Sequence, residues 1–213
     1  MHSAVAFPFG EKRPQWTPGQ FLDRAINPQQ ITTASQTMGF VHESMVWLVN
    51  ALLSGLFERH PGITRMAVME SNASWLPMLL EECDKAFHLY RNERNLQATR
   101  LPSELFNERC FIAFEGDETP VYRQYSFFEE IGIWSSDVYH HDGADAWTAI
   151  REMEKLEVPD TVQAKLMGAN ARRMYGIEPK LFTTTEPDSY PRPDWYPKIE
   201  EIEREYAERM VSA

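Results

Sequence analysis

The chain has 213 residues, 43% of them hydrophobic, which is enough to bury one substantial core. Its formal net charge is −11 at pH 7, and no basic run is longer than Arg172-Arg173. Because binding to a phosphate backbone requires clustered Lys and Arg, this composition argues against a nucleic-acid partner.

The sequence also argues against secretion and membrane insertion. The opening residues lack the basic and apolar regions of a signal peptide, and no apolar run approaches the ~20 residues that span a bilayer. Cys83 and Cys110 are the two cysteines, and they have no metal-binding spacing. We therefore expect free thiols in a cytoplasmic protein without a membrane anchor.

The first part of the chain predicts a strand-like start and one long helix. Residues 1–9 are mostly apolar and lead into a loop that contains Pro and Gly. Apolar residues then recur at helical spacing, which predicts one amphipathic helix of about five turns over residues 40–59. His60-Pro61-Gly62 ends it. The apolar positions are Val46, Val49, Leu52, Leu53, Leu56 and Phe57.

Three strand–loop–helix units follow, and an acidic residue stands at the end of each strand. The predicted strands cover residues 64–69, 109–114 and 131–136. They end at Glu70, at Glu115-Gly116-Asp117 and at Asp137, and the predicted helices after them begin near residues 75, 125 and 144. This order predicts an α/β fold with a parallel sheet and a working face at its carboxyl edge.

The last part of the chain changes in character. A helix is predicted over residues 161–175, with Gly176 as its C-cap. A Pro-rich tail covers about 181–197, and a charged helix over 199–210 is expected to dock as a terminus. We therefore expect one domain over residues 1–178 and a tail with a terminal helix over 179–213.

The most informative segment is I-G-I-W-S-S-D-V-Y-H-H-D at residues 131–142, where an apolar run stops at Asp137 and two histidines follow. Side chains at the carboxyl ends of parallel strands surround the mouth of a sheet or barrel, so this position suits a metal ligand or a general base. A solvated acidic loop is the alternative.

Several blocks of the chain resemble the amidohydrolase-related family. This is the branch of the metal-dependent hydrolase superfamily that includes aminocarboxymuconate semialdehyde decarboxylase and the resorcylate decarboxylases. The similar blocks are L-S-G-L-F-E-R-H-P-G-I (53–63), V-M-E-S-N-A-S-W-L-P-M-L-L-E-E-C-D (68–84), W-S-S-D-V-Y-H-H-D (134–142) and M-G-A-N-A-R-R-M-Y-G-I (167–177). Their order and spacing match across about residues 1–178.

The resemblance implies a (β/α)8 (TIM) barrel of which this chain carries the last four strands. The fifth to eighth strands would lie at residues 1–7, 64–69, 109–114 and 131–136. The H-x-H pair of the family's first strand is not found upstream of these strands. Three explanations are open. The chain is the carboxyl-terminal half of a metal-dependent enzyme, or a non-catalytic remnant that pairs with another chain and binds metal only weakly, or Met1 is an internal methionine of a longer reading frame, which we favour as the reason for the missing half.

The resemblance also implies the site residues. His2 matches a metal-binding His, and Asp137 matches an aspartate that ligates the metal and accepts a proton from metal-bound water. His140 matches a histidine that can support Asp137. Glu70 stands where many members have His, and could ligate the metal, orient water or pair with an arginine.

The expected function is a metal-dependent hydrolase or decarboxylase that acts on a small, carboxylated organic substrate. Zinc is the expected metal, and a homo-oligomer is the expected assembly. Glu115 and Asp117 either line the mouth or form a solvated loop, and Trp75 and Pro77 are expected to be packing residues. The histidines of the helical regions, His42, His60 and His88, are expected at the surface or at helix caps.

Overall fold

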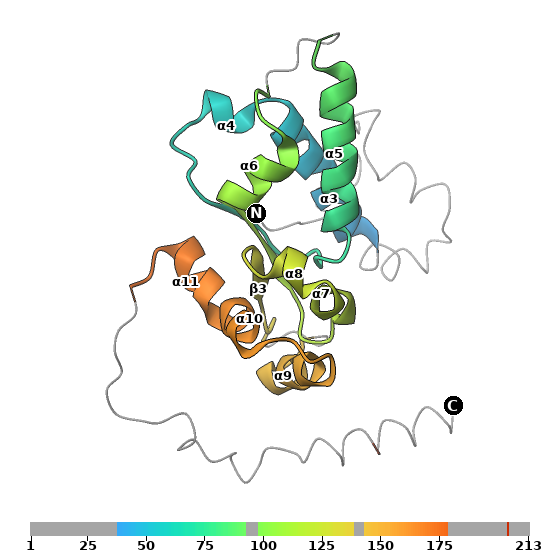
Figure 1. Ribbon diagram of the computed structural model, residues 1–213, viewed down its shortest axis with the longest axis vertical. Helices are drawn as coiled ribbons and strands as arrows, with labels where there is room; N and C mark the ends of the chain where they lie inside the picture. The colour runs from blue at the N-terminus through green and yellow to red at the C-terminus, as the bar shows by residue number, and fades with distance from the viewer. Residues whose placement is uncertain (1–37, 93–97, 139–142, 179–203, 205–213) are drawn as a thin grey trace, which may run out of the picture. The chain divides into compact units, whose positions relative to one another are not determined.

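The computed structural model describes residues 38–92, 98–138, 143–178 and Arg204 (Figure 1). The chain divides into two units, Met1–Ile177 and Glu178–Ala213, and every element below belongs to the first. The predicted strand at residues 1–7, the Pro-rich tail and all but Arg204 of the predicted terminal helix lie outside the described residues. The predicted domain boundary at residue 178 stays a prediction.

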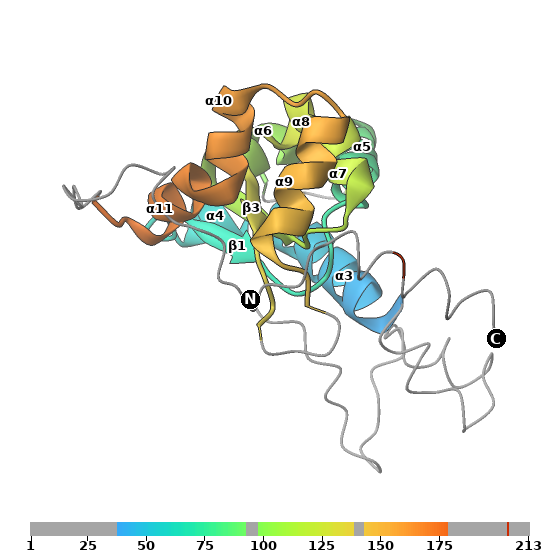
Figure 2. The same ribbon diagram turned by 90° about the horizontal axis from the view of Figure 1, so that it is seen from below.

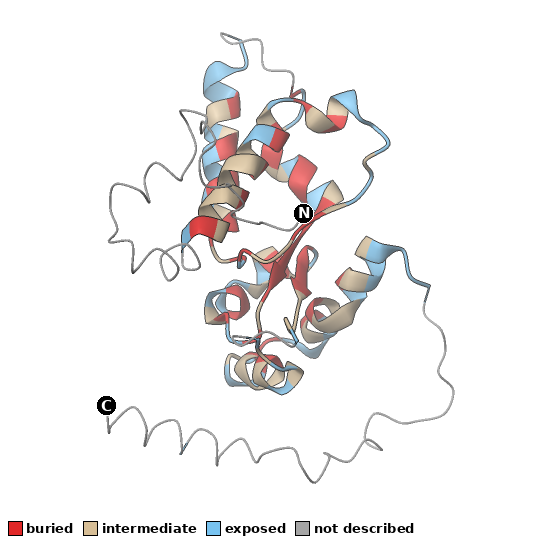
Figure 3. Ribbon diagram, turned by 180° about the vertical axis from the view of Figure 1, so that it is seen from behind, coloured by how far each residue is buried: buried red, intermediate tan, exposed pale blue. Residues whose placement is uncertain are grey.

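A three-stranded parallel sheet lies at the centre of the described part. Strands β1 (Met66–Val68), β2 (Cys110–Phe114) and β3 (Gly132–Trp134) follow one another in this order. Val68 pairs with Ile112, which pairs in turn with Gly132. The predicted parallel sheet is confirmed, although each strand is shorter than predicted. All residues of β2 are buried, and the sheet is among the most buried segments in Figure 3.

Helices α3 (Phe40–Leu53), α5 (Leu76–Tyr90) and α6 (Pro102–Arg109) pack against one another beside the sheet (Figure 1). Their apolar side chains join those of the sheet in the main core, which includes Leu48, Leu52, Leu76, Leu80, Phe106 and Ile112. The sequence did not predict α6. Its apolar signal is short, since only its first residue and two further residues are buried.

The predicted single helix over residues 40–59 is two helices. Gly55 adopts a left-handed conformation with φ of 73°, and it separates α3 from α4 (Leu56–Arg59). Glycine has no Cβ and adopts this conformation at little cost, which ends the first helix. The Arg59 side chain donates a hydrogen bond to the Ser54 carbonyl and closes the turn.

The second half contains α7 (Thr119–Arg123), α8 (Tyr125–Phe128), α9 (Ala146–Lys155), α10 (Asp160–Ala164) and α11 (Asn170–Tyr175). Helices α7 and α9 lie side by side in both views (Figures 1 and 2). The predicted helix over 161–175 is interrupted by a π-helical turn, η3 (Lys165–Ala169), and Gly176 caps it with φ of 67°, as predicted.

Helix α11 is anchored to the start of β3 by the side chains of its N-A-R-R block. The buried Asn170 amide donates to the carbonyl oxygens of Glu129, at 2.9 Å, and Gly132, at 2.8 Å. The Arg173 guanidinium pairs with Glu130 and lies 5.1 Å from the centroid of the Phe111 ring. This block of the sequence therefore has a structural explanation at the sheet, away from the carboxyl ends of the strands.

Candidate functional site

A pocket of about 160 Å³ opens where the three strands end. Each strand end supplies part of its wall: residues 69–72 after β1, residues 113–115 at the end of β2, and Ser135 with Asp137 after β3. The structure thus brings together the three strand ends that the sequence predicted to form the working face. The strand ends meet there because all three strands run in the same direction, so their carboxyl ends lie at one edge of the sheet.

Three carboxylates line the pocket, and each lies in a partly buried residue: Glu70, Glu115 and Asp137. Within the described part of the chain, no Lys, Arg or His lines it. The other polar lining residues are Ser71, Asn72 and Ser135. Such a wall can accept protons and hydrogen bonds, and it favours a cation over an anion.

The backbone at this pocket is unusual. Glu70, Asn72 and Asp137 have φ of 57°, 57° and 48°, in the left-handed region that costs a non-glycine residue about 1–2 kcal/mol. Among the described residues only one further non-glycine residue, Glu157, shares this conformation, and it does not line the pocket. Strained backbone of this kind concentrates at functional sites, so its position supports a role for Glu70 and Asp137.

The segment that carries Asp137 is joined to β2 at its start and packs closely against Gly143. The Ser135 amide donates to the Phe114 carbonyl at 2.9 Å, which extends the pairing of β2 and β3 beyond the strand. Farther along, the chain passes close to its own backbone at Gly143. A Cβ built there would lie 2.7 Å from the Ser136 oxygen and 2.9 Å from the Asp137 oxygen.

The sequence matches the family model for amidohydrolases over residues 11–177. This match covers most of the chain. The chain belongs to the amidohydrolase family. A search of curated proteins finds no match.

Solved structures share the fold of this chain. The 5-carboxyvanillate decarboxylase LigW from Sphingomonas paucimobilis superposes with a TM-score of 0.59 at 22% identity, over 76% of this chain and 48% of that one. A dihydroxybenzoic acid decarboxylase from Polaromonas sp., solved with manganese and 2-nitroresorcinol, has a TM-score of 0.51 at 16% identity, over 71% and 47% of the two chains. An amidohydrolase from Mycobacterium avium subsp. paratuberculosis has a TM-score of 0.50 at 17% identity, over 61% and 32%. The chain therefore spans about half or less of the length of these proteins.

The predicted site residues have different outcomes. Glu70, Glu115 and Asp137 lie at the pocket, whereas Asp117 is exposed and does not line it. His2 and His140 lie outside the described residues, so their roles stay predictions. The histidines His42, His60 and His88 do not line the pocket. Trp75 is buried, and its indole nitrogen donates a hydrogen bond to the Ser71 carbonyl. Pro77 lies in the first turn of α5.

The polar lining residues that were not predicted are Ser71, Asn72 and Ser135. Ser71 and Asn72 stand in the E-S-N sequence directly after β1, where a short polar turn follows an apolar strand. Asn is one of the residues that tolerate a left-handed conformation, so this turn was the available signal.

The described residues do not complete a metal site. Within residues 38–92, 98–138 and 143–178, no three His, Cys, Asp or Glu side chains come together closely enough to hold an ion. Asp137 and Glu70 offer the oxygen donors that divalent ions accept, and the predicted nitrogen donor, His2, is not described. The fit is therefore partial: this wall can supply one or two ligands to a metal.

The two thiols take no part in this site. Cys83 and Cys110 are free and buried. Desolvation raises the pKa of Cys83 to about 11, with the neighbouring Asp84 as a smaller cause, and it raises the pKa of Cys110 to about 12. Both thiols are therefore protonated at neutral pH, which leaves them weak as nucleophiles and metal ligands.

Gly143→Ala is expected to lower activity, because the added Cβ collides with the Ser136 and Asp137 backbone and must displace it. A displacement of about 1 Å at a catalytic group reduces kcat/KM by about 10²-fold. The matched control is Gly62→Ala, since a Cβ at Gly62 meets nothing within 4 Å. Steady-state kinetics of both variants test this, and equal activities would show that the position of Asp137 is unimportant.

Proposed function

We propose that this amidohydrolase is a metal-dependent enzyme that hydrolyses or decarboxylates a small, carboxylated organic substrate at the pocket. The observation that carries the proposal is the convergence of three strand ends on one pocket, with Glu70 and Asp137 held there in left-handed backbone. Membership of the amidohydrolase family supports the reaction class. No helix in the described part of the chain is long and apolar enough to cross a bilayer.

The size of the pocket supports a small substrate. A cavity of about 150 Å³ is known to hold a benzene-sized ring, and the pocket has about 160 Å³. The structural neighbours named as decarboxylases act on single-ring acids by their names. We therefore propose a carboxylated single-ring compound as the substrate class, with the divalent cation that this acidic wall favours offsetting the negative charge of the substrate.

Asp137 is proposed as a metal ligand and as the general base, with His2 as a second ligand and His140 as a partner of Asp137. The metal would be divalent, with zinc as our choice, although one structural neighbour was solved with manganese. When bound, the ion would lower the pKa of water at this site to about 7, so that a carboxylate could accept its proton. In hydrolysis, Asp137 accepts a proton from the attacking water. In decarboxylation, a residue of this wall would deliver a proton to the carbon that loses CO₂, and we propose Glu70 for this role.

The three strands are proposed to be the last of a (β/α)8 barrel, after a fifth strand near residues 1–7. The other strands would come from outside the described residues. No observation favours the alternative of an inactive fragment. A cytoplasmic location and a homo-oligomeric assembly remain predictions.

The test uses the protein as its source makes it. It is assayed against a panel of hydroxylated benzoic acids and related carboxylated rings, with release of CO₂ and of hydrolysis products as readouts. We expect turnover of at least one compound, a loss of roughly 10²-fold or more on dialysis against a chelator, and recovery with Zn²⁺ or Mn²⁺. Turnover that survives complete metal removal would contradict the proposal, and so would a metal-loaded protein inactive on the whole panel.

A further inference from the structure

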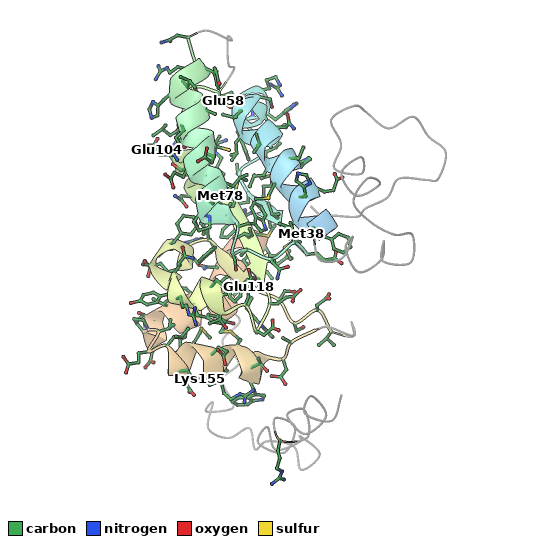
Figure 4. All side chains as sticks on the ribbon, turned by 90° about the vertical axis from the view of Figure 1, so that its right-hand side faces the viewer. Met38, Glu58, Met78, Glu104, Glu118 and Lys155 are labelled. Atoms are coloured by element: carbon green, nitrogen blue, oxygen red, sulfur yellow. The ribbon has the colours of Figure 1, made fainter. Side chains whose placement is uncertain are left out.

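Glu118 is a buried acid that does not line the pocket. It lies in the loop between β2 and α7 (Figure 4). Only 8% of its surface is exposed. Burying a carboxylate costs several kcal/mol unless hydrogen bonds replace its water. The buried Glu118 carboxylate therefore needs hydrogen-bond donors from the protein.

These donors come from the segment between β1 and α5. Glu118 Oε1 accepts hydrogen bonds from the Ala73 amide at 2.8 Å, from the Ser74 amide at 2.7 Å and from the Ser74 hydroxyl. Hydrogen bonds to a carboxylate are about twice as strong as those between neutral groups. Ala73 and Ser74 directly follow the pocket-lining residues 70–72. The contact thus ties the wall after β1 to the loop after β2.

The contact differs from an ordinary helix cap. Asp145 caps α9 from its own N-cap position, with its side chain accepting from the Thr148 amide at 2.8 Å. Glu118 instead reaches its donors across more than 40 residues of sequence. Capping alone would be served by a residue next to α5, so the cross-loop arrangement points to an additional task.

The loop that carries Glu118 is held by further contacts. The Tyr122 hydroxyl donates to the Gly116 carbonyl at 2.9 Å, and the Tyr122 ring packs edge-on against Phe114 with centroids 5.7 Å apart. Burial, and then the charge of Glu118, raise the pKa of Tyr122, so its hydroxyl stays a donor. On the other side of this loop, a Cβ at Gly116 would lie 3.0 Å from the Asp145 carbonyl. The loop after β2 therefore touches the segments after both neighbouring strands.

We propose that Glu118 is a positioning residue, which holds the backbone of residues 70–74 so that Glu70 and Asn72 form the pocket wall. The inference rests on the proposed function, because the wall it positions is that of the proposed active site. Without Glu118, two amides and a hydroxyl lose their acceptor, and nothing else described here bonds these three donors. The left-handed turn at residues 70–72 then loses the contact that fixes its far end.

The experiment compares Glu118→Ala and Glu118→Gln with the matched control Asp84→Ala. Asp84 makes a similar contact away from the pocket: it accepts from the Ser103 amide at 2.9 Å and from the Ser103 hydroxyl at 2.5 Å. Amide hydrogen exchange of peptides covering residues 69–76 and 101–106 is measured for each protein, together with kcat and KM.

In Glu118→Ala, exchange over 69–76 is expected to rise roughly tenfold or more while exchange over 101–106 stays unchanged. Its kcat is expected to fall by about tenfold or more with KM within about threefold. Glu118→Gln keeps an acceptor oxygen, so it is expected to keep most of the exchange protection over 69–76 and most of the wild-type kcat. Asp84→Ala is expected to show the reverse exchange pattern and nearly normal kcat.

Unchanged exchange over 69–76 in Glu118→Ala would overturn the positioning role, and so would an equal loss of kcat in Asp84→Ala. If Glu118→Ala does not fold, Glu118→Asp takes its place, because its carboxylate is one methylene short of the same donors; normal exchange and kcat in it would also overturn the role. Faster exchange with unchanged kcat would place the wall outside the active site and refute the positioning for catalysis. A wild-type protein without metal-dependent turnover would instead refute the proposed function. The kcat values would then not test the role of Glu118, and hydrogen exchange alone would decide whether Glu118 holds the loop.

Discussion

Asp137→Asn is expected to lower turnover by about 10²–10⁴-fold, the usual contribution of a general base, and further where a metal ligand is lost as well. The fold should persist, because Asn tolerates the left-handed conformation that Asp137 adopts, with φ of 48°. The change is nearly isosteric, so the pocket keeps its shape. Steady-state kinetics and thermal unfolding of the same preparation measure the two effects separately.

The control for this variant is Asp117→Asn, which makes the same chemical change at an exposed residue of the neighbouring loop that does not line the pocket. We expect activity close to that of the wild type. Equal losses in both variants would indicate a general effect of negative charge at this end of the molecule. Wild-type activity in Asp137→Asn would remove Asp137 from the catalytic machinery.

Asn170→Asp is expected to have the largest effect on stability. The Asn170 amide nitrogen donates to two backbone carbonyls, those of Glu129 and Gly132, from a side chain that is 2% exposed. Aspartate presents an acceptor to both oxygens, which leaves them unpaired and adds repulsion. Unsatisfied buried groups cost about 1–3 kcal/mol each, so we expect the free energy of unfolding to fall by roughly 2–5 kcal/mol.

Asn50→Asp is the matched control for stability, because Asn50 makes one exposed hydrogen bond, from Nδ2 to the Val46 carbonyl at 2.8 Å. Its expected loss is within about 0.5 kcal/mol. Urea unfolding of both variants and of the wild type measures the difference. A similar, small loss in Asn170→Asp would show that the N-A-R-R block does not anchor α11 to β3.

Much of the fold could be predicted because the spacing of apolar residues indicates which faces of the helices and strands are buried. The fully apolar run of β2 and the helical stripe of α3 are of this kind. The break at Gly55 was not predicted, since a glycine inside a periodic pattern is also compatible with a continuous helix. The π-helical turn at Lys165–Ala169 leaves no signal in a pattern of period 3.6.

The candidate site could be predicted only in part. Glu70 and Asp137 were found because each follows an apolar strand, and parallel strands place their carboxyl ends together. Glu118 was not found, because its partners Ala73 and Ser74 are far away in sequence and only tertiary packing brings them to it. His2 and His140 depend on the family resemblance and stay predictions.

The most direct measurement is the metal content of the purified protein, in the form that its source makes. It is determined by mass spectrometry of the released metal and compared with the metal content of Asp137→Asn. We expect about one divalent ion per molecule in the wild type and a clear loss in the variant, with the fold unchanged. Equal metal content in the two proteins, or an active wild type without metal, would contradict the claim that Asp137 holds a metal at this pocket.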